Sequence, residues 1–340
     1  MQSRLASAFR PSHKVSALYK PMRLSSRILN GEVRAIARAM TLIENEQPEA
    51  EELLKEIFPH TGRAQIIGVT GAPGTGKSTL VDKLVLAYRR RGKSVGVVAV
   101  DPTSPFSGGA ILGDRVRMQD LYLDEGVFIR SMATRGHLGG LARPTAEVVQ
   151  VLDAAGKDLV FVETVGVGQD EVEVTKLADV SLVLLVPGMG DDLQAIKAGL
   201  MEIADIFVIN KADRADVDQL VRGVESALSL AGRPDGWSPP IVRSVASQGQ
   251  GVEELMSAIE HWFGFRRGLP AAFDRRHSAQ DLILQLLRDR LLETAIGQSE
   301  IWARIQAASE EVRLRKRDPY SVVNELIDLL RLGDRIEESS

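Results

Sequence analysis

Gly71-Ala72-Pro73-Gly74-Thr75-Gly76-Lys77-Ser78 matches the pattern G-x-x-x-x-G-K-[ST] at every fixed position. The preceding run Gln65–Thr70 is apolar and predicts a buried strand, and Ser78–Arg91 predicts a helix. A strand before the pattern and a helix after it are the context that a phosphate-binding loop requires. The predicted nucleotide-binding residues of this loop are Gly71, Ala72, Pro73, Gly74, Thr75, Gly76, Lys77, Ser78 and Thr79.

The residue types in this loop have separate roles. Glycines let backbone N–H groups turn inward around a polyphosphate, and the helix that follows adds its positive end. We expect Lys77 to act as a catalytic residue whose cation lies on the β and γ phosphates. We expect the Ser78 hydroxyl to coordinate Mg²⁺.

The chain around this loop alternates between strand and helix patterns. Continuous apolar runs predict further strands at Ser94–Val100, Val127–Arg130, Leu159–Glu163, Ser181–Val186, Ile206–Asn210 and Ile241–Val245. Runs without alternation suit a parallel sheet that is covered on both faces. Helical stretches such as Asp192–Ile203 separate the strands, so the predicted fold class is α/β, with a doubly wound, mostly parallel sheet.

Helices are predicted outside the sheet region as well. Apolar residues recur at spacings of four and three from Leu29 to Ile43 and predict one amphipathic helix over 26–45, before a short helix at Glu49–Ile57. Near the C-terminus, Gln280–Ile296 and Tyr320–Leu332 predict two helices that either pack on their own domain or form a dimer contact. The predicted regions are a basic, disordered tail (1–24), an N-terminal helical extension (25–62), a P-loop domain (63–265) and a C-terminal helical extension (266–340), which serves for dimerisation in the second of these alternatives.

Carboxylates end two of the predicted strands. Asp101 follows Ser94–Val100, and Glu163 ends its own strand. In an open parallel sheet both positions reach the edge where ligands bind, so we predict that Asp101 and Glu163 are catalytic residues and Mg²⁺ ligands. Asp114, in a long loop, is a third candidate metal ligand. The segments Thr103–Gly113 and Val165–Glu171 are glycine-rich and polar, which is typical of switch loops that respond to the γ-phosphate.

The segment Asn210-Lys211-Ala212-Asp213 follows an apolar strand and predicts guanine recognition. The Asp213 carboxylate matches the two N–H donors of guanine, and adenine offers no equivalent pair. Asn210 is expected to bridge the base and the loop, and the Lys211 stem to cover the ring. The backbone N–H groups of Val245 and Ala246, at the end of the next strand, are candidates to meet the guanine oxygen.

Composition excludes several other functions. The 340 residues carry a net charge of −4, which argues against a general nucleic-acid binder. The absence of cysteine excludes disulfides and cysteine catalysis, and the five histidines are scattered. No apolar stretch is long enough to span a membrane, so we expect a cytoplasmic protein. The first 31 residues contain no acidic residue, which is typical of a mitochondrial transit peptide and would place the protein in the mitochondrial matrix. The alternatives are that this segment is a disordered basic tail, or that the true start is Met22.

Over roughly residues 25–335 the chain resembles the MeaB family of GTPases, also called ArgK, whose mammalian member is MMAA. The resemblance rests on the phosphate loop, Asp101-Pro102-Thr103-Ser104, Gly113–Met118, Glu163-Thr164-Val165-Gly166-Val167-Gly168-Gln169, Pro187–Lys197, Asn210–Asp213 and Trp237-Ser238-Pro239-Pro240. It implies a homodimeric metallochaperone that gates cofactor loading of an adenosylcobalamin-dependent acyl-CoA mutase, typically methylmalonyl-CoA mutase, and protects that enzyme. It also implies a third switch that includes Asp191, Asp192, Gln194 and Lys197.

Two other classes compete with this hypothesis. A P-loop kinase, which the older ArgK name suggests, has no need of Asn210–Asp213. A nickel-delivery GTPase predicts a Cys or His cluster, which the sequence lacks. The residue that positions the attacking water is not evident, because Gln169 is not a secure base, so we expect slow intrinsic hydrolysis of GTP to GDP and phosphate that a partner accelerates.

Overall fold

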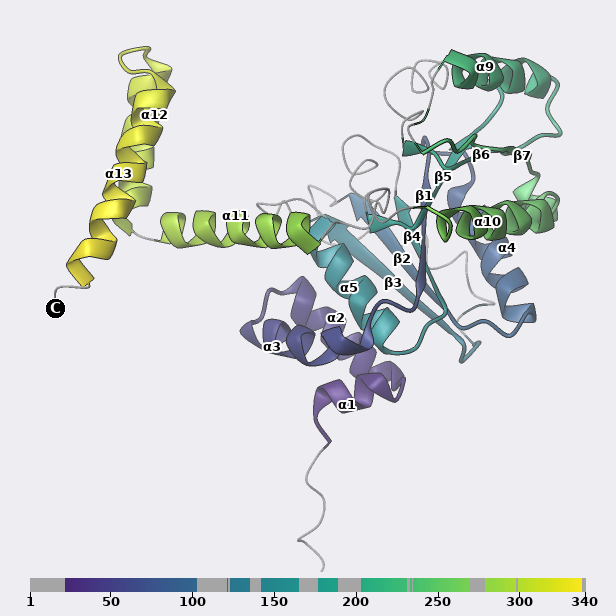
Figure 1. The fold of residues 1–340 in the computed structure, drawn as a ribbon, viewed down its shortest axis with the longest axis horizontal. Helices are drawn as coiled ribbons and strands as arrows, with labels where there is room; N and C mark the ends of the chain where they lie inside the picture. Colours follow the sequence, from purple (N-terminus) through teal and green to yellow (C-terminus); the bar gives the residue numbers. More distant parts are fainter. Residues whose placement is uncertain are drawn as a thin grey trace, which may run out of the picture.

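The centre of the fold is a seven-stranded sheet in the order β3-β2-β4-β1-β5-β6-β7, as seen in the computed structural model of the chain (Figure 1). The strands are β1 (Gln65–Thr70), β2 (Val95–Pro102), β3 (Val127–Thr134), β4 (Leu159–Thr164), β5 (Val180–Leu185), β6 (Ile206–Ile209) and β7 (Ile241–Arg243). The structure describes residues 22–102, 121, 123–134, 142–164, 177–188, 203–230, 233, 235–269, 279–297 and 299–337.

All six neighbouring strand pairs are parallel. The prediction of a doubly wound α/β fold is therefore confirmed, although seven of the fourteen strand ends differ from the predicted ones by one or two residues and the end of β3 differs by four. Strands β4, β5 and β6 are buried along their whole length. Because both of their faces are covered, the runs are mostly apolar and do not alternate, and the polar exceptions are Ser181 in β5 and Glu163 and Thr164 at the end of β4.

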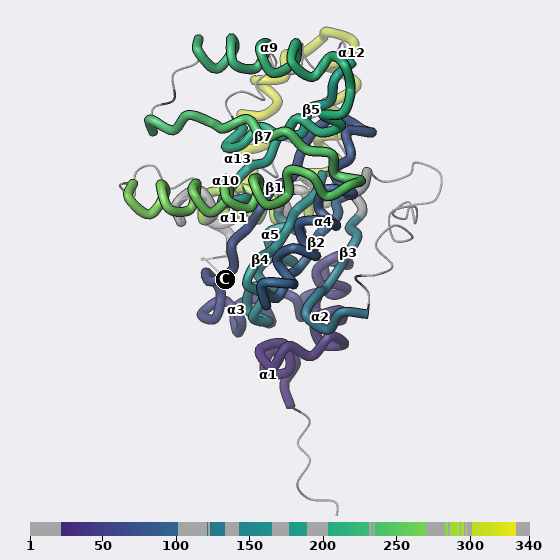
Figure 2. Tube along the Cα trace, turned by 90° about the vertical axis from the view of Figure 1, so that its right-hand side faces the viewer, coloured from purple at the N-terminus to yellow at the C-terminus, as the bar shows by residue number. Residues whose placement is uncertain are grey.

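Helices cover both faces of the sheet. One face packs on α4 (Lys77–Arg90) and α10 (Val252–Arg266), through a core that includes Leu84, Phe161 and Trp262. The opposite face packs on α5 (Ala142–Ala154) over β2 and β4, and on α9 (Val217–Leu230) over β5 and β6. In both views α9 and the N-terminal helix α1 lie at opposite ends of the sheet region (Figures 1 and 2).

The N-terminal extension differs from its prediction. The single helix expected over 26–45 is two helices, α1 (Leu24–Leu29) and α2 (Val33–Glu44), and α3 (Pro48–Ile57) follows. The chain turns at Gly31, whose φ of 73° ends the helical path and whose N–H donates to the Ile28 carbonyl over 2.8 Å. As a result Ile28 is buried, whereas Val33, expected on the buried face, is 60% exposed.

The C-terminal residues form a helical arm that projects from the sheet region (Figure 1). It consists of α11 (Ala279–Gly297), α12 (Ser299–Arg313) and α13 (Pro319–Glu337), and the helix α12 was not predicted. Each arm helix contacts the next one along the chain. Arg290 on α11 forms an ion pair with Glu51 on α3 and so links the arm to the N-terminal extension.

Candidate functional site

The phosphate loop lies between β1 and α4, at the carboxyl edge of the sheet. Gly76, the residue before α4, has a φ of 94°. A Cβ atom at this position would lie 2.4 Å from the Asn210 side-chain nitrogen. The turn and the close approach therefore both require glycine here, which explains the fixed glycine of the pattern in physical terms.

Lys77 is the first residue of α4, and its side chain folds back onto the phosphate loop. The residue is 6% exposed, and its Nζ donates to the carbonyls of Gly71 over 2.6 Å and Ala72 over 3.1 Å. The cation is thus positioned at the N-terminal end of α4, where the positive end of the helix also favours an anion. Such an arrangement suits a polyphosphate, as predicted for this loop.

Ser78 and Glu163 meet beside the phosphate loop. The Ser78 hydroxyl donates to Glu163 Oε1 over 2.5 Å, and Glu163 is 6% exposed. Asp101 lies on the neighbouring strand β2, two residues beyond Ala99, the backbone partner of Glu163. The structure therefore brings two of the four predicted metal-site residues into contact and places a third, Asp101, on the adjoining strand.

A hydroxyl and a carboxylate are oxygen donors of the kind that Mg²⁺ prefers, so this pair fits the ion. Within the described parts of the chain, no group of three or more His, Cys, Asp or Glu side chains is placed to hold a metal. Mg²⁺ commonly completes its coordination with water and substrate phosphate, so a two-donor protein site beside a phosphate loop is sufficient. Asp114 lies outside the described residues.

Asn210 connects the phosphate loop to both guanine-recognition segments. Its side-chain nitrogen donates to the Thr75 carbonyl over 2.7 Å. Its side-chain oxygen accepts from the Ser244 hydroxyl over 3.2 Å and the Ala246 N–H over 3.0 Å. Asn210 is 2% exposed, so one buried amide ties together three segments far apart in the sequence.

Lys211 makes a second link across the site. Its Nζ donates to the Gly74 carbonyl over 2.8 Å, and its φ of 55° is unusual for a residue with a side chain. Asp213 is exposed at the same loop, where its carboxylate is accessible to a base. The sequence predicted the role of this segment, whereas the left-handed conformation of Lys211 carries no local signal.

The two backbone N–H groups proposed to meet the guanine oxygen already have partners. The Val245 N–H donates to the Gln250 carbonyl over 3.1 Å, and the Ala246 N–H donates to Asn210. A contact with the base from either group requires that it share or exchange its present acceptor. Their assignment to nucleotide binding stays a prediction.

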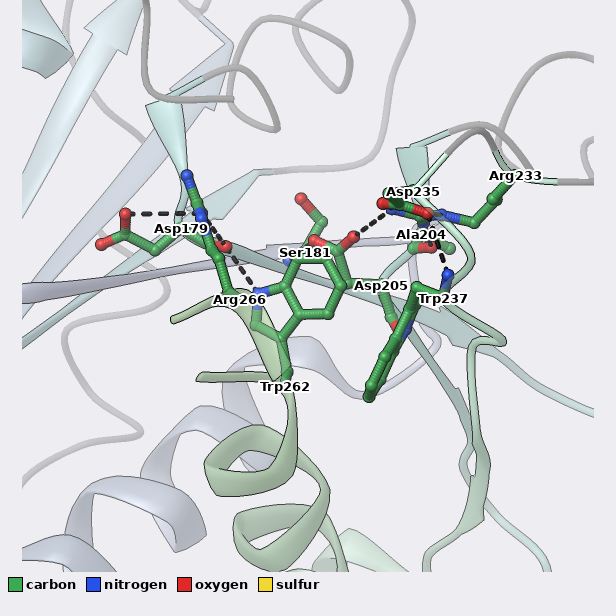
Figure 3. Close-up of polar contacts among 9 residues, drawn as sticks. All are labelled: Asp179, Ser181, Ala204, Asp205, Arg233, Asp235, Trp237, Trp262 and Arg266. Carbon is green, nitrogen blue, oxygen red and sulfur yellow. Dashed lines mark hydrogen bonds and ion pairs between the residues drawn. The ribbon is translucent and has the colours of Figure 1, made fainter. Parts of the chain in front are cut away.

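A buried polar network lies at the amino ends of β5 and β6, at the opposite end of the strands from the phosphate loop (Figure 3). The sequence did not predict this network. Arg233 pairs with Asp205 over 3.1 Å and Asp235 over 2.7 Å, and the indole N–H of Trp237 donates to the Asp205 carbonyl over 2.8 Å. The Trp262 indole donates to the Asp179 carbonyl over 2.8 Å. These contacts fix the starts of β5 and β6 and so support the strands that lead to the guanine segment.

Trp237 belongs to the Trp237-Ser238-Pro239-Pro240 stretch, which supported the family resemblance but carried no local signal for this network. The predicted third-switch residues Asp191, Asp192, Gln194 and Lys197 lie outside the described residues, after β5.

None of the described helices is both long and apolar enough to cross a bilayer.

The fold and the site together define a P-loop GTPase, with a phosphate loop, an adjoining oxygen-donor pair and a linked guanine-recognition segment. The chain belongs to the MeaB family, because the family model described as methylmalonyl Co-A mutase-associated GTPase MeaB matches residues 36–300. The resemblance found from the sequence is thereby confirmed. The protein binds guanine nucleotide and hydrolyses GTP.

Individual relatives agree with this placement. A GTPase of Pyrococcus abyssi is 48% identical over 324 residues, which cover 93% of this chain and 99% of the relative. The GTPase ArgK of Escherichia coli is 41% identical over 279 residues, which cover 80% and 83% of the two chains. The crystal structure of LAO/AO transport system kinase matches with a TM-score of 0.68 and 29% identity, covering 91% of this chain and 96% of that one.

Proposed function

We propose that this GTPase is a chaperone of an adenosylcobalamin-dependent acyl-CoA mutase, such as methylmalonyl-CoA mutase. It would gate the loading of the cobalamin cofactor and protect the mutase from inactivation. The observation that carries this proposal is the family match over residues 36–300, since the family is described as mutase-associated. The matched range includes the phosphate loop, Glu163 and the guanine segment.

Within the site, each group has a proposed role in GTP binding and hydrolysis. Lys77 neutralises charge on the β and γ phosphates, and Asp213 accepts two N–H bonds from guanine. Ser78, Glu163 and Asp101 would hold Mg²⁺ directly or through water, and the ion would supply charge neutralisation at the phosphates. Because hydrolysis depends on positioning and electrostatics, the fixed contact between Ser78 and Glu163 supports this assignment.

The segment after β5 is the proposed third switch. The carboxyl end of β5, which leads into this segment, lies against the phosphate loop, because a Cβ atom on Gly71 would be 2.4 Å from the Leu184 carbonyl. A change at the phosphates is therefore next to the strand that leads into Asp191–Lys197. In this proposal Gln194 and Lys197 transmit the nucleotide state to the mutase and do not hold phosphate.

The helical arm is the proposed dimer contact. Among the α11 side chains that the structure describes, four apolar ones are more than half exposed in the single chain: Ile283, Leu284, Leu287 and Leu291. Exposed apolar patches of this kind mark interaction sites. A second copy of the arm is a suitable partner, since α12 and α13 also expose Trp302 and Val323 at 47% and 52%.

The dimer contact is tested by sedimentation. We expect Leu287→Asp to shift the protein from dimer to monomer, because the charge would be buried in the contact. Leu230→Asp is the matched control, since Leu230 is 86% exposed at the end of α9, outside the arm. A Leu287→Asp protein that sediments as the native protein does would remove the arm from the proposal.

The chaperone role is tested by capture of a purified adenosylcobalamin-dependent mutase on immobilised protein loaded with GTP or GDP. We expect the amount of mutase retained to differ between the GTP-loaded and GDP-loaded proteins, because switch segments change conformation when the γ-phosphate is lost. Lys77→Ala, which should lose tight nucleotide binding, is expected to remove the difference. Failure to retain the mutase in either state would contradict the chaperone proposal and leave the GTPase assignment intact.

A further inference from the structure

Two buried threonine hydroxyls link the ends of β1 and β4. Thr164 Oγ1 donates to Thr70 Oγ1 over 3.2 Å, and each residue is 1% exposed. The last backbone pair between these strands is Val69 with Glu163. The hydroxyl bond therefore lies one residue beyond the ladder between β1 and β4 and links the two strands at this level, while β5 pairs with Thr70 and β2 pairs with Thr164 from the outer sides.

Each threonine adjoins a residue of the nucleotide site. Thr70 is followed by Gly71, the first residue of the phosphate loop. Thr164 is preceded by Glu163, whose carboxylate accepts the hydrogen bond from Ser78 over 2.5 Å. The hydroxyl bond thus joins the two strand ends whose spacing determines where the Glu163 carboxylate lies relative to the helix that carries Ser78.

The two hydroxyls act from the other side of the sheet. Successive residues of a strand point to opposite faces. Phe161 packs in the core beneath α4, and Val160 and Val162 pack in the core beneath α5. Glu163 shares the α4 face with Phe161, and Thr164 shares the α5 face with Val162. Thr164 is therefore not in the nucleotide site, and any effect on that site must pass through the backbone of β4.

We propose that Thr164, through its hydrogen bond to Thr70, is a positioning residue that holds the Glu163 carboxylate beside Ser78 and so sets the affinity of the GTP-bound protein for Mg²⁺. The inference rests on the proposed magnesium site. Without the bond, the end of β4 stays paired with β2 but loses this tie to β1. The distance between the two strand ends is then less fixed, so Glu163 spends part of its time away from Ser78. The site then needs more Mg²⁺ to reach the same occupancy, while the chemistry at full occupancy is unchanged.

The test is the Mg²⁺ dependence of GTP hydrolysis in Thr164→Val, which keeps the shape of the side chain and removes the hydroxyl. The Mg²⁺ concentration for half-maximal rate should rise about three- to tenfold, which corresponds to one buried neutral hydrogen bond. The maximal rate at saturating Mg²⁺ should stay within about twofold of native, because the transition-state contacts are kept. Thr164→Ser should restore the native response.

A double variant separates positioning from stability. Thr164→Val leaves Thr70 with a buried hydroxyl that has lost its partner, which destabilises the fold. Thr70→Val combined with Thr164→Val removes both polar groups, so the thermal unfolding temperature should recover towards native. The Mg²⁺ shift should persist in the double variant. If the double variant recovers both properties, the pair is only structural and the positioning role is wrong.

Two further variants distinguish failure of this inference from failure of the magnesium site itself. Ser78→Ala removes one proposed oxygen ligand of Mg²⁺, and Glu163→Gln removes the negative charge of the other. If neither changes the Mg²⁺ response, the site is wrongly placed and the inference falls with it. If both change it and Thr164→Val does not, the site stands and the positioning role of Thr164 is refuted.

Discussion

Replacing Asn210 by alanine tests whether one amide holds the nucleotide site together. The native side chain makes three buried hydrogen bonds, to the Thr75 carbonyl, the Ser244 hydroxyl and the Ala246 N–H. Alanine removes all three and leaves the Thr75 carbonyl and the Ala246 N–H without these partners. Buried neutral hydrogen bonds contribute about 1 kcal/mol each, so the free energy of unfolding should fall by about 3 kcal/mol.

The same change should weaken nucleotide binding. Since the loops are no longer held in place before binding, the nucleotide has to order them, and up to about 3 kcal/mol of affinity is lost, or roughly 100-fold. The assay is equilibrium titration with a fluorescent GDP analogue, alongside urea unfolding without nucleotide. Ser244→Ala is the matched control, because it removes only the 3.2 Å bond to Asn210.

We expect the Ser244→Ala protein to lose about 1 kcal/mol of stability. Its affinity for nucleotide should stay close to that of the native protein, unlike the affinity of the Asn210→Ala protein. An Asn210→Ala protein that binds GDP as tightly as Ser244→Ala would refute the reasoning. That result would mean that the loops are positioned by other contacts, such as the bond from Lys211 to the Gly74 carbonyl.

Three further predictions concern the base, the phosphates and pH. Asp213→Asn should weaken guanine binding and improve xanthine binding, measured by competition titration, and equal affinity of the native protein for ATP and GTP would contradict the base assignment. Lys77→Ala and Glu163→Ala should each slow steady-state phosphate release, and native rates in both variants would place the phosphate site elsewhere. Burial raises the pKa of the Glu147 carboxyl above its ordinary value of 4.5. The nearby Arg143 guanidinium lowers the same pKa, but the effect of burial is larger. The stability that Glu147 contributes is therefore complete below the unfolded pKa and is lost as pH rises through the folded pKa. Glu147→Gln should reduce the loss of unfolding free energy between acid and neutral pH, and unchanged pH profiles from urea unfolding would show that its carboxyl is not desolvated.

The parts of the fold that were predictable are those with local signals. The phosphate loop was identified because its glycines and Lys77 occur at fixed spacing between a strand and a helix. The buried strands were identified because continuous apolar runs such as Ile206–Ile209 have no exposed face. Strand order along the sheet is not local, and only the parallel class followed from the run composition.

The parts that failed depend on distant contacts or on a single turn. Spacing alone joined α1 and α2 into one helix, because the periodic pattern continues across Gly31. The helix α12 was missed because only Ile301 and Ala308 are buried among its described side chains, so no apolar face is apparent. The hydroxyl pair Thr70 and Thr164 brings together residues separated by 94 positions, which no local pattern indicates.

The most direct test of the account is the rate of GTP hydrolysis with and without a cognate adenosylcobalamin-dependent acyl-CoA mutase. The account predicts that the mutase accelerates hydrolysis by the native protein. It also predicts that Gln194→Ala and Lys197→Ala keep native nucleotide affinity and intrinsic rate but lose most of this acceleration. Full acceleration of both variants would contradict the third-switch role, and a native protein whose rate does not respond to the mutase would contradict the chaperone function itself.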